Sequence, residues 1–227
     1  MIATGLLGGS FNPAHVGHRR LSLSAMRLLG LDEIWWLVSP GNPLKPRAGM
    51  APLEARFGSA RAMARRSRIR VTAIEAELGT RYTVDTLEVL VRRFPHRRFI
   101  WLMGADNLAQ FHRWRDWRKI AALVPIAVVR RPGYDTNAVA APAMAWLRRF
   151  VRPAAGAKDW TEWRLPSLVL LDVPPDPTSA TALRAADPDW HEKVIDSHDP
   201  GTLRDGVTRR LLRQRRQFAR KYTRSRS

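Results

Sequence analysis

The sequence predicts an α/β fold built on a doubly wound parallel sheet, and three observations lead to this prediction. Apolar runs and helical patterns alternate along the chain at the spacing of βαβ units. The expected strands are apolar throughout, which is typical of a sheet that is covered on both faces. The chain has 227 residues, of which 45% are hydrophobic, so it is long enough to bury a full core. In such sheets ligands bind at the carboxyl ends of the strands, near the point where the strand order reverses.

The first units of this pattern occupy residues 2–66. An apolar strand is expected over 2–9, where it ends in two glycines. A helix is expected over 16–29, because leucine and alanine recur on one face at helical spacing. Residues 33–39 form the second expected strand, followed by a Pro-Gly-Asn-Pro loop signal. Residues 52–66 are predicted to be helical, with a proline at an early position that a helix tolerates.

The middle of the chain continues the alternation. A third strand is expected over 68–73 and a fourth over 98–103, since both runs are short and apolar. The segment 82–94 between them carries apolar residues on one helical face. Two short helices follow, over 107–111 and 117–123.

The last part of the chain is less regular. A fifth strand over 126–129 ends at an Arg-Arg-Pro-Gly turn. A helix is expected over 137–150 and a late strand over 167–173, whereas the segment between them has no clear pattern. Residues 202–216 read as a basic helix with four apolar residues on one face.

Charge and composition limit the classes of function. The net charge of +19 predicts anionic partners, but residues 204–227 supply almost half of it, with ten basic residues and one acidic residue. We expect one domain over 1–216 with a C-terminal helical portion, and a basic, frayed tail over 217–227. The absence of cysteine excludes a disulfide scaffold and a cysteine nucleophile. No apolar stretch approaches the ~18–20 residues of a membrane span, and the start lacks a signal peptide's basic residues. These features favour a cytoplasmic protein that does not contact membranes.

The first motif with chemical content is Gly-Gly-Ser-Phe-Asn-Pro-Ala-His-Val-Gly-His, over residues 8–18. It lies between the first expected strand and the first expected helix. Glycines at such a turn let the backbone approach a ligand, and the helix N-terminus offers free N–H groups to phosphate. His15 and His18 are three residues apart, so both rings can face that site. The motif is neither a P-loop nor a dinucleotide-binding fingerprint, because the required spacing is absent.

A second motif, Thr-Ser-Ala-Thr-Ala-Leu-Arg over residues 178–184, follows the late strand. Ser179 or Thr181 can cap a helix, which places Arg184 about one turn further on. Hydroxyl groups and a guanidinium at a helix N-terminus form a suitable cradle for a polyphosphate. Taken alone, the segment favours an ordinary helix cap with a solvated arginine over a phosphate site.

Together the two motifs resemble the nucleotidylyltransferase superfamily. Its members carry Gly-x-Phe-(Asp/Asn)-Pro-x-His-x-Gly-His near the start and Ile-Ser-x-Thr-x-x-Arg near the end. Here Asn12 stands where many members have aspartate, and Thr178 replaces the isoleucine. The resemblance implies a Rossmann-like nucleotidylyltransferase fold.

The middle of the chain resembles one family within it, the bacterial nicotinate-nucleotide adenylyltransferases. The resemblance rests on Arg-Tyr-Thr-Val-Asp-Thr over 81–86, Gly-Ala-Asp-Asn-Leu over 104–108 with Phe111 and Trp114, Arg-Pro-Gly over 131–133 and Pro-Leu-Lys over 43–45. These motifs stand in the family's order across residues 2–185.

The resemblance implies an enzyme of NAD biosynthesis that transfers AMP from ATP to nicotinate mononucleotide. The acceptor phosphate attacks the α-phosphorus in line, so catalysis consists of positioning and charge stabilisation without a protein nucleophile. Mg²⁺ is expected on the ATP phosphates, held mostly by substrate and water, and no protein metal ligands are expected.

The resemblance also implies site residues. The residues expected to act in catalysis are His15, His18, Lys45 and Arg184. Those expected to bind ATP are Gly8, Gly9, Ser10, Phe11, His15, His18, Gly104, Asp106, Ser179 and Arg184. Those expected to bind nicotinate mononucleotide are Lys45, Tyr82, Thr83 and Trp114, with Trp117 as an alternative to Trp114 for stacking on the pyridine ring.

Three alternatives stay open at this point. The acceptor could be nicotinamide mononucleotide, or it could be phosphopantetheine as in a related adenylyltransferase. From a different class, the basic tail and the pI of about 11.6 are consistent with a nucleic-acid-binding protein. The tail has little aromatic interleaving, however, and we do not expect nucleic acid to be the partner. The oligomeric state is not indicated by the sequence.

Overall fold

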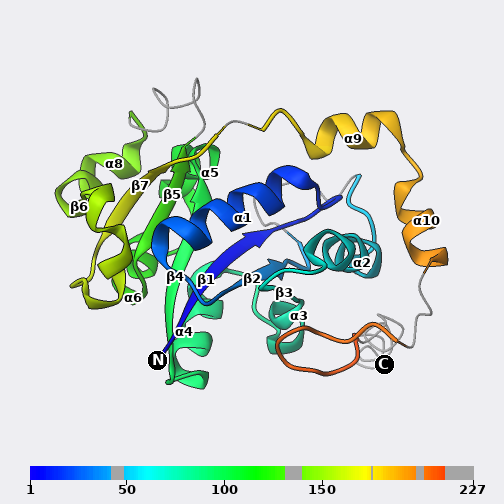
Figure 1. Cartoon of the computed structure of the whole chain (residues 1–227), viewed down its shortest axis with the longest axis horizontal. Helices are drawn as coiled ribbons and strands as arrows, with labels where there is room; N and C mark the ends of the chain where they lie inside the picture. The colour runs from blue at the N-terminus through cyan, green and yellow to red at the C-terminus, as the bar shows by residue number, and fades with distance from the viewer. Residues whose placement is uncertain (42–48, 131–139, 175, 198–201, 213–227) are drawn as a thin grey trace, which may run out of the picture.

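The computed structural model describes residues 1–41, 49–130, 140–174, 176–197 and 202–212. Its centre is a seven-stranded sheet in the order β3-β2-β1-β4-β5-β7-β6, and every pair of neighbouring strands is parallel. Figure 1 shows the twisted sheet with helices packed against it. The strands are β1 (Ile2–Gly9), β2 (Glu33–Val38), β3 (Ile69–Thr72), β4 (Arg97–Gly104), β5 (Ile126–Arg130), β6 (Val151–Arg152) and β7 (Leu168–Asp172).

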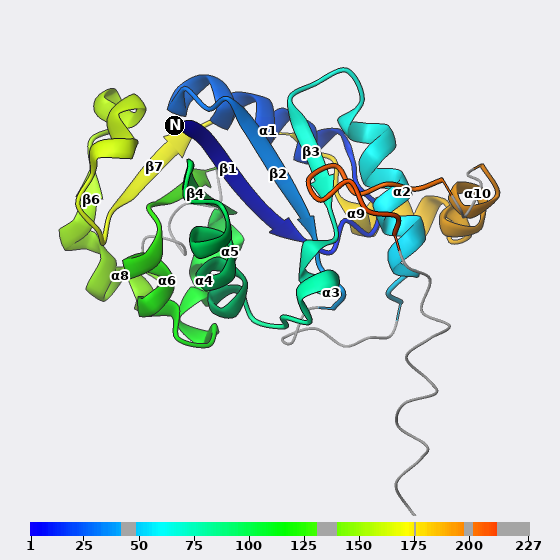
Figure 2. The same cartoon turned by 90° about the horizontal axis from the view of Figure 1, so that it is seen from below.

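Helices cover both faces of the sheet, which confirms the predicted doubly wound α/β class. The α-helices are α1 (Val16–Leu29), α2 (Leu53–Ala64), α3 (Ile74–Leu78), α4 (Thr83–Arg93), α5 (Ala105–Gln110), α6 (Trp117–Leu123), α8 (Pro142–Leu147), α9 (Ala180–Ala186) and α10 (Trp190–Asp196). The 3₁₀ helices are η1 (Phe111–Arg113), η2 (Arg148–Phe150) and η3 (Ala154–Glu162). Seen from below, α1 lies on one side of the sheet and α4, α5 and α6 lie on the other (Figure 2).

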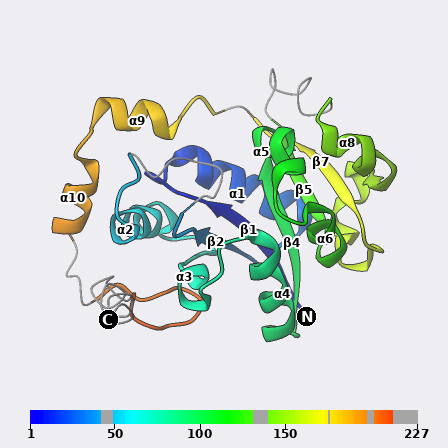
Figure 3. The ribbon, with the colours of Figure 1, turned by 180° about the vertical axis from the view of Figure 1, so that it is seen from behind.

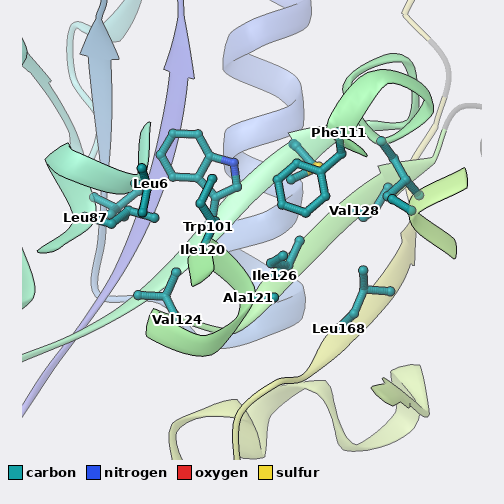
Figure 4. Close-up of a cluster of buried hydrophobic side chains, with 14 of the residues drawn as sticks. Leu6, Leu87, Trp101, Phe111, Ile120, Ala121, Val124, Ile126, Val128 and Leu168 are labelled. Carbon is teal, nitrogen blue, oxygen red and sulfur yellow. The ribbon is translucent and has the colours of Figure 1, made fainter. Parts of the chain in front are cut away.

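The strands are apolar throughout because their alternate residues enter two different cores. In β4, Ile100 and Leu102 pack in the core under α1, α2 and η3. The alternate residues of the same strand, Trp101 and Met103, pack in the core under α4, α5, α6 and α8. Figure 4 shows this second core, with Trp101 and Phe111 among the aliphatic side chains.

The strand order reverses between β1 and β4. The chain runs outward from β1 through β2 to β3, then crosses back to β4 on the other side of β1. The loops that follow β1 and β4 therefore diverge at their carboxyl ends, where such sheets bind ligands. Figure 3 shows this end of the sheet from behind, with α5 leaving β4 and α9 lying near the start of α1.

The helix prediction for residues 202–216 is wrong over its described part. Residues 202–212 form a loop that is closed by an antiparallel bridge between Arg204 and Leu211. Its Gly206 N–H bonds the Val71 carbonyl of the edge strand β3 at 2.8 Å. The sheet edge offered backbone partners that override the helical pattern. Residues 213–216 and the predicted tail over 217–227 lie outside the described residues.

Other elements are shorter than expected or were not expected. In the segment predicted as a helix over 137–150, α8 starts only at Pro142 and becomes the 3₁₀ helix η2, and residues 137–139 lie outside the described part. The stretch 152–166, which the pattern left unassigned, contains η3. The short helices α3 and α10 were not expected. Among the described residues, no helix is long and apolar enough to cross a membrane.

Candidate active site

A cavity of about 290 Å³ opens at the carboxyl ends of β1 and β4, where the strand order reverses. Segments from both halves of the chain form its wall. Ten of the residues expected from the sequence line it: Gly8, Gly9, Ser10, Phe11, His18, Tyr82, Thr83, Gly104, Asp106 and Trp114.

The turn between β1 and α1 is tightly packed against the sheet. A Cβ atom at Gly8 would lie 2.7 Å from the Trp101 ring, so no other residue fits there without displacing that indole. Phe11 has a positive φ of 48°, which is rare for a bulky residue and is held by burial. Its ring stacks on Trp36 with a centroid distance of 4.9 Å. The turn therefore has one fixed shape at the cavity floor.

The two histidines of this turn are adjacent. His15 is the residue before α1, and its backbone N–H donates to Nδ1 of His18 at 3.2 Å. Because Nδ1 accepts this N–H, the neutral His18 ring carries its proton on Nε2. The ring centroids lie 3.8 Å apart, with His18 on the cavity wall and His15 buried. His18 is thus the better placed of the two to contact a phosphate.

The side chain of Asn12 explains why an amide is suitable in place of aspartate. Its Nδ2 donates to the Gly49 carbonyl at 2.9 Å, and its Oδ1 accepts from the Ala51 N–H at 3.2 Å. A carboxylate has no donor for the Gly49 carbonyl. Asn12 therefore ties the β1–α1 turn to the segment before α2.

The second motif contacts the first. Arg184 in α9 donates from Nη1 to the Asn12 carbonyl at 2.6 Å and from Nη2 to Thr181 Oγ1 at 3.3 Å. Ser179 caps α9 by accepting the Ala182 N–H at 3.1 Å, as the sequence predicted. Ala180 of this segment lines the cavity. The two phosphate-binding motifs predicted from the sequence thus meet at one site.

Arg56 of α2 braces the floor of the site, and sequence reasoning did not identify it. Its side chain is 1% exposed. It donates to the carbonyls of Ser10, Ser39 and Ala51, at 2.8, 2.8 and 2.9 Å. These carbonyls follow β1, follow β2 and precede α2, so one guanidinium fixes three loops.

The opposite wall is aromatic and lies at the start of α4. Tyr82 precedes α4, and the first N–H groups of this helix have no helical acceptor. Trp114 lines the cavity and packs edge-on against Trp101, with centroids 6.1 Å apart. Trp117 instead packs edge-on against Phe111 and Trp146, in the core beside α8. Of the two tryptophans considered for stacking, Trp114 is the one that the structure places on the wall.

The end of β4 contributes a carboxylate to the wall. Gly104 is the residue before α5, and Asp106 lies in the first turn of that helix with its side chain exposed. Asp106 therefore lies inside the helix and is not its N-cap. Its carboxylate is available to accept hydrogen bonds from a ligand's hydroxyl groups.

Four charged wall residues were not among the site residues predicted from the sequence, namely Glu75, Arg81, Arg113 and Arg115. The Arg115 guanidinium lies over the Tyr82 ring, 4.8 Å from its centroid. Burial raises the pKa of the Glu75 carboxyl to about 7. An acid between apolar residues was the available signal for Glu75. Two predictions, Lys45 and the Arg-Pro-Gly turn over 131–133, lie outside the described residues.

The described part of the chain contains no group of three or more His, Cys, Asp or Glu residues arranged to hold a metal ion. The polar groups around the cavity are instead hydrogen-bond donors and isolated charges. Such an arrangement is suited to binding and orienting a phosphorylated ligand.

Comparisons with known proteins agree with this geometry. A family described as cytidylyltransferase-like matches residues 6–186. A probable nicotinate-nucleotide adenylyltransferase of Erythrobacter litoralis is 62% identical over 211 residues, covering 93% of this chain and 94% of that protein. Another from Parvibaculum lavamentivorans is 53% identical over 183 residues, covering 81% and 91%. The Plasmodium falciparum nicotinic acid mononucleotide adenylyltransferase, solved with NaAD, superimposes with a TM-score of 0.60 over 86% of this chain and 94% of its own. At 16% identity, this last likeness shows the fold alone.

Proposed function

Because the chain belongs to the cytidylyltransferase-like family, and within it to the nicotinate-nucleotide adenylyltransferases, we propose that it transfers AMP from ATP to nicotinate mononucleotide. The products are nicotinate adenine dinucleotide and pyrophosphate. The observation that carries the proposal is the cavity at the strand switch point, which the first motif and an aromatic wall line. Arg184 of the second motif is bonded to Asn12 of the first beside it.

The reaction exchanges one phosphorus–oxygen bond for another. An oxygen of the mononucleotide phosphate forms a bond to the α-phosphorus of ATP while the bond from that phosphorus to the bridging β-oxygen breaks. Pyrophosphate leaves with the bonding electrons. The protein's work is to align the two substrates and to stabilise the charge on the transferring phosphoryl group.

The β1–α1 turn is the proposed site of the α-phosphate. Gly8, Gly9 and Ser10 lie along the wall, and the His18 ring lines it beside them. We assign His18 to the charge that develops on the α-phosphate, with buried His15 supporting its orientation. Phe11 closes this part of the floor.

The β- and γ-phosphates are assigned to the start of α9. Arg184 brings a guanidinium to the rim beside Asn12, and Ser179 fixes the first turn of the helix. Gly104 allows close approach of the nucleotide, and Asp106 accepts from a ribose hydroxyl. Lys45, which lies outside the described residues, stays a prediction for a phosphate contact.

The acceptor occupies the wall formed by Tyr82, Thr83 and Trp114. Free N–H groups in the first turn of α4 bind the nicotinate carboxylate, favoured by the helix dipole. The Trp114 indole stacks on the pyridine ring.

Mg²⁺ is proposed to enter with ATP. The wall carries donors and single carboxylates, which fits a metal held by the ATP phosphates and water. Such an ion neutralises phosphate charge during transfer. The single-domain boundary at residue 216 and the cytoplasmic location likewise stay predictions.

Pyrophosphate release tests the function. Purified protein is assayed with ATP, Mg²⁺ and one acceptor: nicotinate mononucleotide, nicotinamide mononucleotide or phosphopantetheine. Fast release is expected with nicotinate mononucleotide. Release with phosphopantetheine alone would keep the phosphate site and contradict the assignment of the aromatic wall. Release with none of the three would contradict the proposed reaction.

A further inference from the structure

A buried carboxyl group lies beside the proposed nicotinate subsite and has no role in the mechanism above. Glu75 in α3 is 8% exposed, yet it lines the same cavity as Tyr82 and Thr83. Thr86 of α4 donates to Glu75 Oε1 at 3.3 Å, and the hydroxyl groups of Thr86 and Thr80 are 2.8 Å apart. This chain of hydroxyls holds the carboxyl against the first turns of α4.

Burial dominates the ionisation of this group. It raises the pKa of Glu75 to about 7, and the Thr86 hydrogen bond opposes the rise. Near neutral pH the carboxyl is therefore divided between its acid and its ionised form. The other ionisable groups that line the cavity are His18, Arg81, Tyr82, Asp106, Arg113 and Arg115. Asp85 and Asp205 lie on segments packed beside α3. Within the part of the chain that the structure describes, the Glu75 side chain accepts its hydrogen bond from Thr86.

We propose that Glu75 is a specificity-determining residue, which favours a carboxylate on the substrate's pyridine ring when it is protonated and a carboxamide when it is ionised. The protonated acid donates its O–H to the substrate carboxylate. The ionised form repels that carboxylate and accepts from the N–H₂ of a carboxamide. The proton comes from solvent and stays on Glu75, so the adenylyl transfer itself is unchanged. This role rests on the proposed function.

The position of Glu75 makes such discrimination strong. A like charge or an unpaired polar group in a buried site costs far more than the same mismatch in water. The N–H groups at the start of α4 bind either substituent through its oxygen atoms, so they separate acid from amide less sharply. The ionisation of Glu75 then makes the preference of this wall for acid or amide depend on pH.

The test is a competition between the two mononucleotides. Nicotinate and nicotinamide mononucleotide are mixed with ATP and Mg²⁺, and the two dinucleotide products are separated and counted from pH 5.5 to 8.5. The ratio of product rates gives the ratio of kcat/KM for acid over amide. Because the phosphate groups of the two substrates titrate alike, their contribution cancels. We expect the ratio to fall by about tenfold between pH 6.5 and 8.5, as Glu75 ionises.

Variants separate discrimination from a structural role. Glu75→Gln is neutral at every pH, so its acid-to-amide ratio should be flat and should exceed that of the wild type at pH 8.5. Thr86→Val removes a hydrogen bond that favours the ionised form, so the midpoint should move to higher pH by about half a unit. Glu77→Gln is the matched control, because Glu77 lies in the same helix and pairs with Arg93 and Arg210. It should reproduce the wild-type profile.

A direct titration covers the case in which Glu75→Gln does not fold. The carbon resonance of the Glu75 carboxyl is followed with pH in the wild-type protein, free and saturated with nicotinate mononucleotide. Its midpoint should rise on binding, since the substrate carboxylate favours the protonated form. A flat wild-type ratio, or an unchanged midpoint on binding, would overturn the role of Glu75 while nicotinate turnover keeps the proposed function. Absence of turnover with both mononucleotides would overturn both.

Discussion

The guanidinium of Arg184 donates a hydrogen bond of 2.6 Å to the backbone carbonyl of Asn12, 172 positions earlier in the chain. This bond joins the last motif of the chain to the turn after its first strand. Hydrogen bonds from a charged donor to a carbonyl are among the stronger ones in proteins. The bond therefore holds the N-terminal part of α9 against the β1–α1 turn. The proposed pyrophosphate site is therefore made by two segments that meet only in the folded protein.

Replacing Arg184 by alanine should lower kcat/KM for ATP by about a hundredfold, because charge on the leaving pyrophosphate loses its guanidinium partner. Lysine should restore less than a tenth of the activity, since it cannot form both bonds of the fork to Asn12 and Thr181. Initial rates at varied ATP give the constants. Leu183→Ala, on the exposed face of the same helix, serves as the control. If the alanine variant retains wild-type kinetics, Arg184 does not bind the leaving group.

Two substitutions of His18 distinguish its two nitrogen atoms. Asparagine can still accept the His15 N–H but does not reach as far as Nε2, whereas alanine loses both functions. Both variants should lose about 10²–10³-fold in kcat, because the α-phosphate loses a donor. Only alanine should also lower the melting temperature. The rates are compared with those of His191→Ala in α10. Equal melting temperatures for the two variants would argue that the hydrogen bond from the His15 N–H to His18 does not stabilise the turn. Near-normal turnover would remove His18 from the mechanism.

The two tryptophans should respond differently to truncation. Trp114→Ala should raise KM for nicotinate mononucleotide about tenfold or more and leave KM for ATP within twofold, because the wall loses its stacking surface. Trp117→Ala should instead lower stability by about 3 kcal/mol, since this ring packs between Phe111 and Trp146. Steady-state kinetics and thermal unfolding of both variants decide between them. A KM effect confined to Trp117→Ala would move the acceptor site by one turn.

The elements predicted well are those whose pattern is local. The apolar run before Gly9 and the run around Trp101 gave strands within one or two residues of the observed ends, because each strand serves two cores. The basic segment from residue 202 has a helical pattern as well. In the structure, however, Gly206 pairs with the edge strand, and the Asp205 carboxylate accepts hydrogen bonds from the Thr72 hydroxyl and the Ala73 N–H. Partners more than a hundred positions away are not visible in a local pattern.

The difference between local patterns and distant partners also explains which site residues could be predicted from the sequence. His18 and Arg184 were identified because each belongs to a motif with a characteristic spacing. Glu75 and Arg56 stand in ordinary helical sequence, and their importance comes from burial and from partners on other segments. A single charged residue among apolar neighbours is a weak signal until the fold shows what surrounds it.

Arg56 should be essential to the shape of the floor. Arg56→Met keeps most of the side-chain volume but leaves the carbonyls of Ser10, Ser39 and Ala51 without this donor. Each buried carbonyl that loses a charged donor lowers the free energy of unfolding by about 1–3 kcal/mol. Because the loops can relax and expose these carbonyls to water, we expect a total loss of about 3–5 kcal/mol. For a protein of this size that lowers the melting temperature by roughly 6–20 °C.

The control for this change is Arg61→Met on the exposed side of the same helix, which should shift the melting temperature by less than about 2 °C. Saturating ATP should recover part of the stability lost in Arg56→Met, because binding to the native state restores the turn after β1. Thermal unfolding with and without ATP measures both effects. A melting temperature that matches the control would show that the three loops hold their positions without the guanidinium, and that the packing of Phe11 on Trp36 is sufficient to shape the floor.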